Sequence, residues 1–257
     1  MKILKQILFF GCIFLFINSA KSQKETDERA YIDFHDGIGF HAPDSMFFMN
    51  LRFRMQNRAG ITTDDDFEIS SVEATVRRLR LRFDGFVLNP KLTYYLQLAF
   101  SLSDQDWEGS HKPNIVRDAL IHYHINKNLY FGFGQGKLPG NRQRVISSGS
   151  QQFADRSIIN SIFTLDRDFG AFAYYTLPVK NVIFNFKGAI SSGEGRNIST
   201  TDKGLCYTTR VEVLPFGKFK DKGDYFEGDL LRESKPKLSI AATWAKNEGA
   251  IRTEGQR

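Results

Sequence analysis

The sequence predicts an all-β protein, a transmembrane antiparallel β-barrel. Three observations predict this class. Arginine alternates with apolar residues over residues 78–83, an export signal precedes the rest of the chain, and no later stretch has the ~20 apolar residues of a membrane-spanning helix. The chain is also rich in aromatic residues, with 24 Phe and 9 Tyr. An exported membrane protein without apolar helices can cross the bilayer with a closed set of strands.

Residues 76–103 carry the clearest strand pattern. With a period of two, Leu79 and Leu81 lie on one face, whereas Arg78, Arg80 and Arg82 lie on the other. An arginine facing lipid at mid-bilayer costs ~2 to 4 kcal/mol, so this row must face water. The pattern favours a barrel with an apolar outside and a cationic channel inside. The alternative is a soluble exported β-sandwich, a glycan-binding protein in which the apolar stripes form a shared core.

Residues 1–22 have the layout of a secretory signal peptide. Lys2 and Lys5 precede the apolar run 7–17, and small residues follow up to Ser22. Its removal lowers the formal charge from +6 to +3, because this segment holds three lysines and no acid. So small an excess argues against nucleic acid as a partner. Cys206 is then the remaining cysteine and cannot form an intrachain disulfide. We expect a protein of the cell outer membrane in contact with its lipid.

The remaining chain divides into an exported N-terminal arm, residues 23–45, and a β-barrel part, residues 46–257. Residues 59–75 are expected to form a polar loop. Long and short links then alternate, as in outer-membrane barrels, except that residues 215–236 are long where a short turn is expected, which suggests a flap or a short helix. The pattern predicts about nine strands, whereas bacterial single-chain barrels have even numbers. We therefore expect a partial barrel, the front part of a longer protein.

Cationic side chains on the polar phase of these strands are the candidates for an anion-pore lining. They are Arg52, Arg54, Arg78, Arg80, Arg82, Lys187 and Arg210. Cations around a narrow lumen concentrate anions and repel cations, and a guanidinium binds phosphate through two hydrogen bonds. This interpretation predicts small anions such as phosphate as the solute. In the alternative interpretation, these side chains pair with carboxylates such as Asp84, Asp118 and Glu212 and brace the wall.

Other chemistry has little support in the sequence. His122 and His124 share a face, but two ligands without a third are too few for a zinc site. A nucleophile-elbow motif is missing. Gly132, Gly134 and Gly136 are spaced strictly by two on a strand, unlike the glycines of a nucleotide-binding turn. The sequence therefore predicts a protein that is not an enzyme and has neither cofactor nor metal.

Three ordered stretches carry a resemblance to a known family. They are RRLRLRFDGFVLNPKLTYYLQLAFS (77–101), DALIHYHINKNLYFGFGQGKLPGN (118–141, continuing to 175) and FGKFKDKGDYFEGDL (216–230). Together they resemble the phosphate-selective porin O/P family over residues 47–249. The resemblance implies a passive diffusion channel built as a sixteen-stranded, homotrimeric porin with a third loop folded into the lumen.

Residues 138–167 are the expected inward loop. The glycines of residues 132–136 fall on the inward face, where missing side chains let another backbone approach. The cations of this loop and of its first flanking residue are candidates for a constriction: Lys137, Arg142, Arg144, Arg156 and Arg167.

Overall fold

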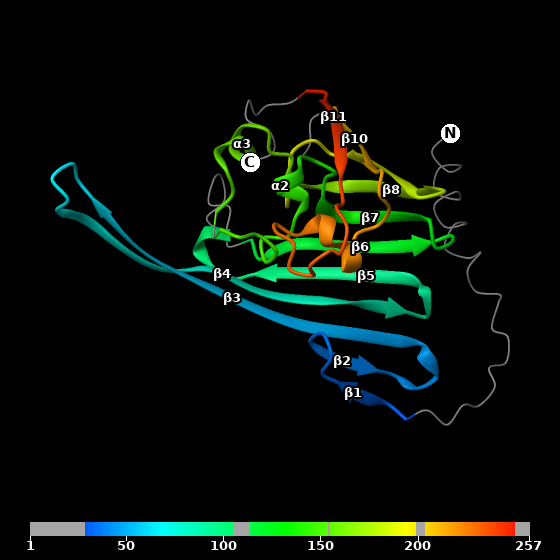
Figure 1. Ribbon diagram of the computed structural model, residues 1–257. Coiled ribbons are helices and arrows are strands. Elements are labelled where there is room, and N and C mark those ends of the chain that lie inside the picture. Colours follow the sequence, from blue (N-terminus) through cyan, green and yellow to red (C-terminus); the bar gives the residue numbers. More distant parts are fainter. Residues whose placement is uncertain (1–28, 105–113, 154, 199–203, 250–257) are drawn as a thin grey trace, which may run out of the picture.

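The computed structural model describes residues 29–104, 114–153, 155–198 and 204–249. Within them the strands form one antiparallel sheet whose order follows the chain from β1 to β11. β1 pairs with β2 and β11 with β10, and the sheet is not closed into a ring. Figure 1 shows the curved sheet with the connections that carry α2 and η3 lying against it. The expected signal peptide lies outside the described residues.

The strands are β1 (Tyr31–Asp33), β2 (Ile38–His41), β3 (Phe47–Thr63), β4 (Ile69–Val87), β5 (Asn89–Ala99), β6 (Val116–His124), β7 (Leu129–Lys137), β8 (Arg167–Val179), β9 (Val182–Ser191), β10 (Cys206–Leu214) and β11 (Ile240–Asn247). Short helical turns lie between them: η1 (Pro43–Ser45), η2 (Leu102–Asp104), α2 (Arg142–Val145), α3 (Ile158–Ile162) and η3 (Lys220–Tyr225). The all-β antiparallel prediction is confirmed, and the nine predicted strands correspond to β3 to β11. The N-terminal arm contributes β1 and β2 in addition.

Asparagine side chains close the two short links between β4 and β7. The Asn89 carboxamide oxygen accepts a hydrogen bond from the backbone N–H of Lys91 at 2.9 Å. Asn126 accepts in the same way from the N–H groups of Asn128 at 2.8 Å and Leu129 at 3.0 Å. Asparagine favours such turns because its side chain can replace a backbone acceptor.

The prediction of a polar loop over residues 59–75 is wrong. β3 and β4 stay paired through this range and turn at residues 64–68, where the Asp64 carboxylate accepts from the N–H groups of Asp66 and Glu68. The paired residues Ile61 and Val72 continue the apolar face, and β-branched residues favour a strand. The hairpin therefore extends far beyond the rest of the sheet (Figure 1).

The two faces of the sheet differ in chemistry. Apolar side chains on one face are open, with exposed fractions of 64% for Phe53 and 63% for Phe133. The other face carries most of the buried charged groups and a small apolar cluster in which Leu138 packs against Phe172. Within the described part of the chain, no helix is long and apolar enough to cross a membrane.

Candidate functional site

The arginines of β3 and β4 lie side by side on the same face. In the antiparallel register Arg52 stands opposite Arg82, and Arg54 stands opposite Arg80. Like charges at directly opposed positions destabilise a sheet unless counter-charges lie near them. This face therefore requires carboxylates or polar groups from elsewhere in the chain.

Two carboxylates supply part of that compensation. Asp84 contacts one opposed pair of arginines, at 3.2 Å from Arg52 Nη2 and 2.8 Å from Arg82 Nε. Asp104 accepts two hydrogen bonds from Arg80, at 2.8 and 2.5 Å, and one from Arg117 at 3.0 Å. Burial alone would raise the pKa of Asp104, but the hydrogen bonds and positive charges of its arginine partners lower it to about 2. The carboxylate stays ionised at neutral pH.

The segment between β7 and β8, residues 138–166, covers the arginine face. Its Ser148 hydroxyl accepts hydrogen bonds from Arg54 at 2.7 Å and from Arg80 at 3.0 Å. Two cations hold the segment's own turns through backbone carbonyls. Lys137 donates to Ile146 at 3.2 Å, and Arg156 donates to the same carbonyl at 3.2 Å.

Asp166 and Asp118 organise the end of this segment. Arg167 forms two hydrogen bonds with Asp118, at 2.8 and 3.0 Å, and one with Asp166 at 2.8 Å. Arg144 also pairs with Asp166. Burial opposes ionisation of Asp166, but the positive charges around it, first that of Arg167, hold its pKa well below the usual range. The segment thus returns to the sheet through a buried ion network.

A β-bulge adds a cation that period-two alternation does not assign to this face. Gln97 pairs with Asp118 and Leu98 with Val116, so Arg117 has no partner of its own in the ladder. Arg117 and Asp118 are consecutive and both are buried. Bulges commonly redirect a side chain in this way. The adjacent Arg-Asp pair in the sequence was the available signal, but strict alternation places Arg117 outside.

Lys187 and Arg210 belong to a second ion group around Glu212. The Glu212 carboxylate lies 2.9 Å from Lys187 Nζ and 2.6 Å from Arg210 Nε. Arg210 also donates to the Gly140 carbonyl at 2.8 Å, which ties this group to the 138–166 segment. Lys187 and Arg210 are therefore both paired with a carboxylate of the same chain, Glu212.

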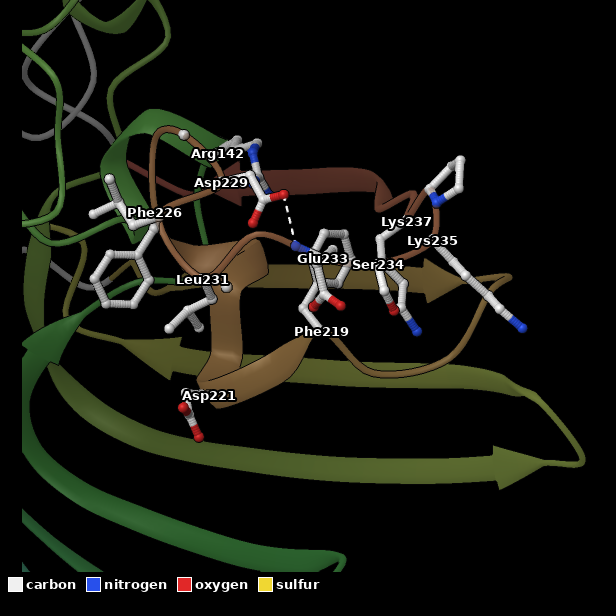
Figure 2. Close-up of a pocket in the computed structure, with 14 residues that line it drawn as sticks. Arg142, Phe219, Asp221, Phe226, Asp229, Leu231, Glu233, Ser234, Lys235 and Lys237 are labelled. Carbon is white, nitrogen blue, oxygen red and sulfur yellow. Dashed lines mark hydrogen bonds between the residues drawn. The ribbon is translucent and has the colours of Figure 1, made fainter.

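Arg142 lies apart from the other constriction candidates. It is exposed and lines a cavity of about 680 Å³ whose walls otherwise come from residues 219–237 (Figure 2). Apolar side chains such as Phe219 and Leu231 line this cavity, and Asp229 accepts from the backbone N–H of Glu233 at 2.8 Å. The cavity does not coincide with the arginine face.

A further contact joins the long β3–β4 hairpin to the 138–166 segment. The Asp155 carboxylate lies 2.6 Å from Arg58 and 2.8 Å from Arg77, and Arg58 also pairs with Glu73. Hydrogen bonds from Arg77, followed by the charges of both arginines, lower the pKa of Asp155. Arg77 is the extra residue of a bulge between β3 and β4, because Gln56 stands opposite Arg78 and Asn57 stands opposite Val76. Sequence alternation did not place Arg77 here either.

The histidines belong to an aromatic row. The His124 ring stacks on Tyr130 at 4.8 Å between ring centroids, and Tyr130 stacks on Tyr174 at 4.5 Å. Across the described ranges there is no group of three or more residues suited to hold a metal ion.

Comparison with known proteins gives the family. A search of curated proteins finds no match to the chain. The model of a family described as phosphate-selective porin O and P matches residues 49–217, which include β4 to β10 and the 138–166 segment. This is a family of channels rather than of enzymes. Because the match covers more than half of the 257 residues, the chain belongs to the phosphate-selective porin O and P family.

Proposed function

We propose that this protein is an outer-membrane porin, a passive diffusion channel whose arginine-rich inner face favours anions such as phosphate. Family membership supports a channel, and the open apolar face of the sheet supports contact with outer-membrane lipid. In this proposal residues 1–22 direct export, and the working unit is the homotrimer that the family resemblance implies. Residues 46–257 form the barrel part, and residues 23–45 are an exported arm whose β1 and β2 extend the sheet.

The observation that carries the proposal is an excess of buried and half-buried arginines around the 138–166 segment. Among the described residues, the carboxylates Asp104, Asp118 and Asp166 lie among a larger group of arginines: Arg54, Arg78, Arg80, Arg117, Arg144, Arg156, Arg167 and Arg196. The segment's Asp155 pairs instead with Arg58 and Arg77. Positive potential in a low-dielectric channel raises the local concentration of anions.

Several of these cations use neutral partners. Arg54 donates to a serine hydroxyl, and Arg156 donates to backbone carbonyls. A hydroxyl or a carbonyl positions a cation without cancelling its charge. In this proposal the wall keeps a net positive charge near the 138–166 segment after the carboxylates are counted, whereas Arg52 and Arg82 further along the sheet are paired with Asp84.

The reversal potential of the purified protein in a planar bilayer with a KCl gradient tests the proposal. Wild-type channels should prefer chloride over potassium. The Arg54→Gln variant should move the reversal potential toward cation preference, because it removes a charge and leaves a side chain that can still donate to Ser148. Arg58→Gln is the control, because Arg58 lies near the hairpin extension and is paired with Glu73 and Asp155.

Cation preference in the wild-type channel would contradict the proposed selectivity. Equal reversal potentials for the wild-type and Arg54→Gln channels would exclude Arg54 from the lining.

A further inference from the structure

The connection between β10 and β11, residues 215–239, reaches the inner face from the end opposite to the 138–166 segment. The strands are antiparallel and follow the chain, so the links after β4, β6, β8 and β10 share one end of the sheet. The first three of these are short. The link after β10 belongs to that end but folds back along the sheet, whereas the 138–166 segment enters after β7 from the other end.

The two connections meet through backbone groups. The Glu227 N–H donates to the Ser150 carbonyl at 2.9 Å. In return the Glu227 carboxylate accepts from the Gln152 N–H at 3.0 Å. Ser150 and Gln152 follow Ser148, the residue that contacts Arg54 and Arg80. The contact is therefore only two to four residues away from the arginine face.

A buried charged group anchors the 215–239 connection. The Tyr225 hydroxyl donates to Glu212 with both carboxylate oxygens at 2.7 Å, and it also contacts Lys187. Burial and the neighbouring Glu212 charge raise the pKa of Tyr225, so its hydroxyl remains a donor. Glu212 is 2% exposed, and a buried carboxylate that loses a partner is costly, which holds Tyr225 in place.

We propose that residues 215–239 are a second lumen insert, which together with the 138–166 segment builds the constriction and sets its width. This inference rests on the proposed channel function. The cations of the 138–166 segment and of the wall set the sign of the preferred ion. The second insert supports the Ser150 to Gln152 turn from the opposite side and occupies cross-section that a short turn would leave open.

Single-channel conductance of the full protein tests the width. Replacing residues 218–236 by Asn-Gly, a two-residue hairpin turn, should raise the conductance by about twofold or more, because permeation depends on pore diameter. The Glu227→Ala variant should raise it less and add fluctuations between levels. Glu227→Gln is the matched control, because an amide oxygen can still accept from the Gln152 N–H, and its conductance should equal that of the wild type.

A cysteine pair tests the contact without deleting the insert. Ser150→Cys with Glu227→Cys should form a disulfide under mild oxidation, because a backbone hydrogen bond of 2.9 Å places the two residues near the Cα separation of ~4.4–6.8 Å that a disulfide needs. Each single cysteine variant controls for Cys206, which is buried. The oxidised channel should keep the wild-type conductance.

The outcomes separate the two proposals. Wild-type conductance in the deletion variant, or failure of the cysteine pair to crosslink, would overturn the second insert while leaving anion preference intact. A wild-type protein that forms no channel would instead overturn the proposed function, and the crosslink would still report whether the two segments meet.

Discussion

Asp104 shows how one carboxylate can hold several cations. It lies at the start of a connection, outside the strands, and accepts hydrogen bonds from Arg80 and Arg117 in a buried position. Its backbone carbonyl also accepts from Arg196 at 3.0 Å. Three segments of the chain therefore depend on one residue.

The Asp104→Asn variant should be destabilised by ~3 to 5 kcal/mol, because it leaves Arg80 and Arg117 buried without their counter-charge. The folded pKa of Asp104 is lowered, so its contribution to stability is present above the unfolded value of 3.8 and is lost as the pH falls through about 2. Thermal unfolding followed by circular dichroism at pH 5, 4, 3 and 2 measures both effects.

Between pH 4 and pH 2 the wild type should lose more stability than Asp104→Asn, by on the order of 2 kcal/mol. Parallel pH profiles for the two proteins would show that the ion pair makes no linked contribution.

Among the elements, the β6–β7 pair depends on a glycine at an unusual backbone angle. Gly134 has φ +125°, and a Cβ there would lie 2.2 Å from the Ala119 carbonyl oxygen of the neighbouring strand. Both conditions disfavour any residue with a side chain. Gly134 precedes the 138–166 segment by only a few residues, so the start of that segment depends on this pairing.

Gly134→Ala should cost at least ~1 to 3 kcal/mol through backbone strain, with the steric clash in addition. Gly60→Ala in the long hairpin is the matched control, because a Cβ at Gly60 would meet nothing within 4 Å. The temperature at which the protein loses its folded mobility in electrophoresis compares the two. Equal melting of both variants would refute the close approach at Gly134.

The strands could be predicted from the sequence, but their ends and bulges could not. Period-two alternation located β3 to β11 because each strand has one apolar face. It ended the β3–β4 hairpin too early, because Ala59, Gly60 and Thr75 resemble loop residues. Ile61 and Val72 nevertheless continue the apolar face of these two strands. It also missed Arg77 and Arg117, because a bulge shifts the phase of the alternation by one residue.

The seven proposed lining cations lie on the polar face, but the sequence could not show how each is paired. Arg52 and Arg82 share Asp84, Arg80 takes Asp104, and Lys187 and Arg210 share Glu212. Arg82 and Asp84, like Arg210 and Glu212, are two residues apart on one strand. The other partners come from other strands and connections, up to 32 residues away in the case of Arg52 and Asp84. These five cations therefore fit the alternative interpretation, in which the lining residues pair with carboxylates and brace the wall. Arg54 instead has an uncharged partner, the Ser148 hydroxyl.

For the whole molecule, polarity is inverted relative to a water-soluble β-sandwich. Charged groups such as Asp168 and Arg210 are buried, and aromatic residues such as Phe53 and Phe133 are open. Lipid around the open aromatic side chains and water among the charged groups would solvate both kinds of residue.

This arrangement predicts that the protein is extracted from bacterial envelopes only with detergent and that its electrophoretic mobility changes on heating. A freely soluble periplasmic monomer would instead support the β-sandwich alternative. Substituting Phe53 and Phe133 by Ser should weaken retention in the envelope fraction, with Phe153→Ser, located in the inserted segment, as the control.

The contact between Glu227 and the Ser150 to Gln152 turn has a consequence for how such a channel diversifies. In the channel proposed above, two connections form the narrowest region, whereas the hydrogen-bonded sheet forms the wall that supports them. Substitutions in these two connections can change which solutes pass without changing the register of the strands. Pore width and barrel structure can therefore vary independently.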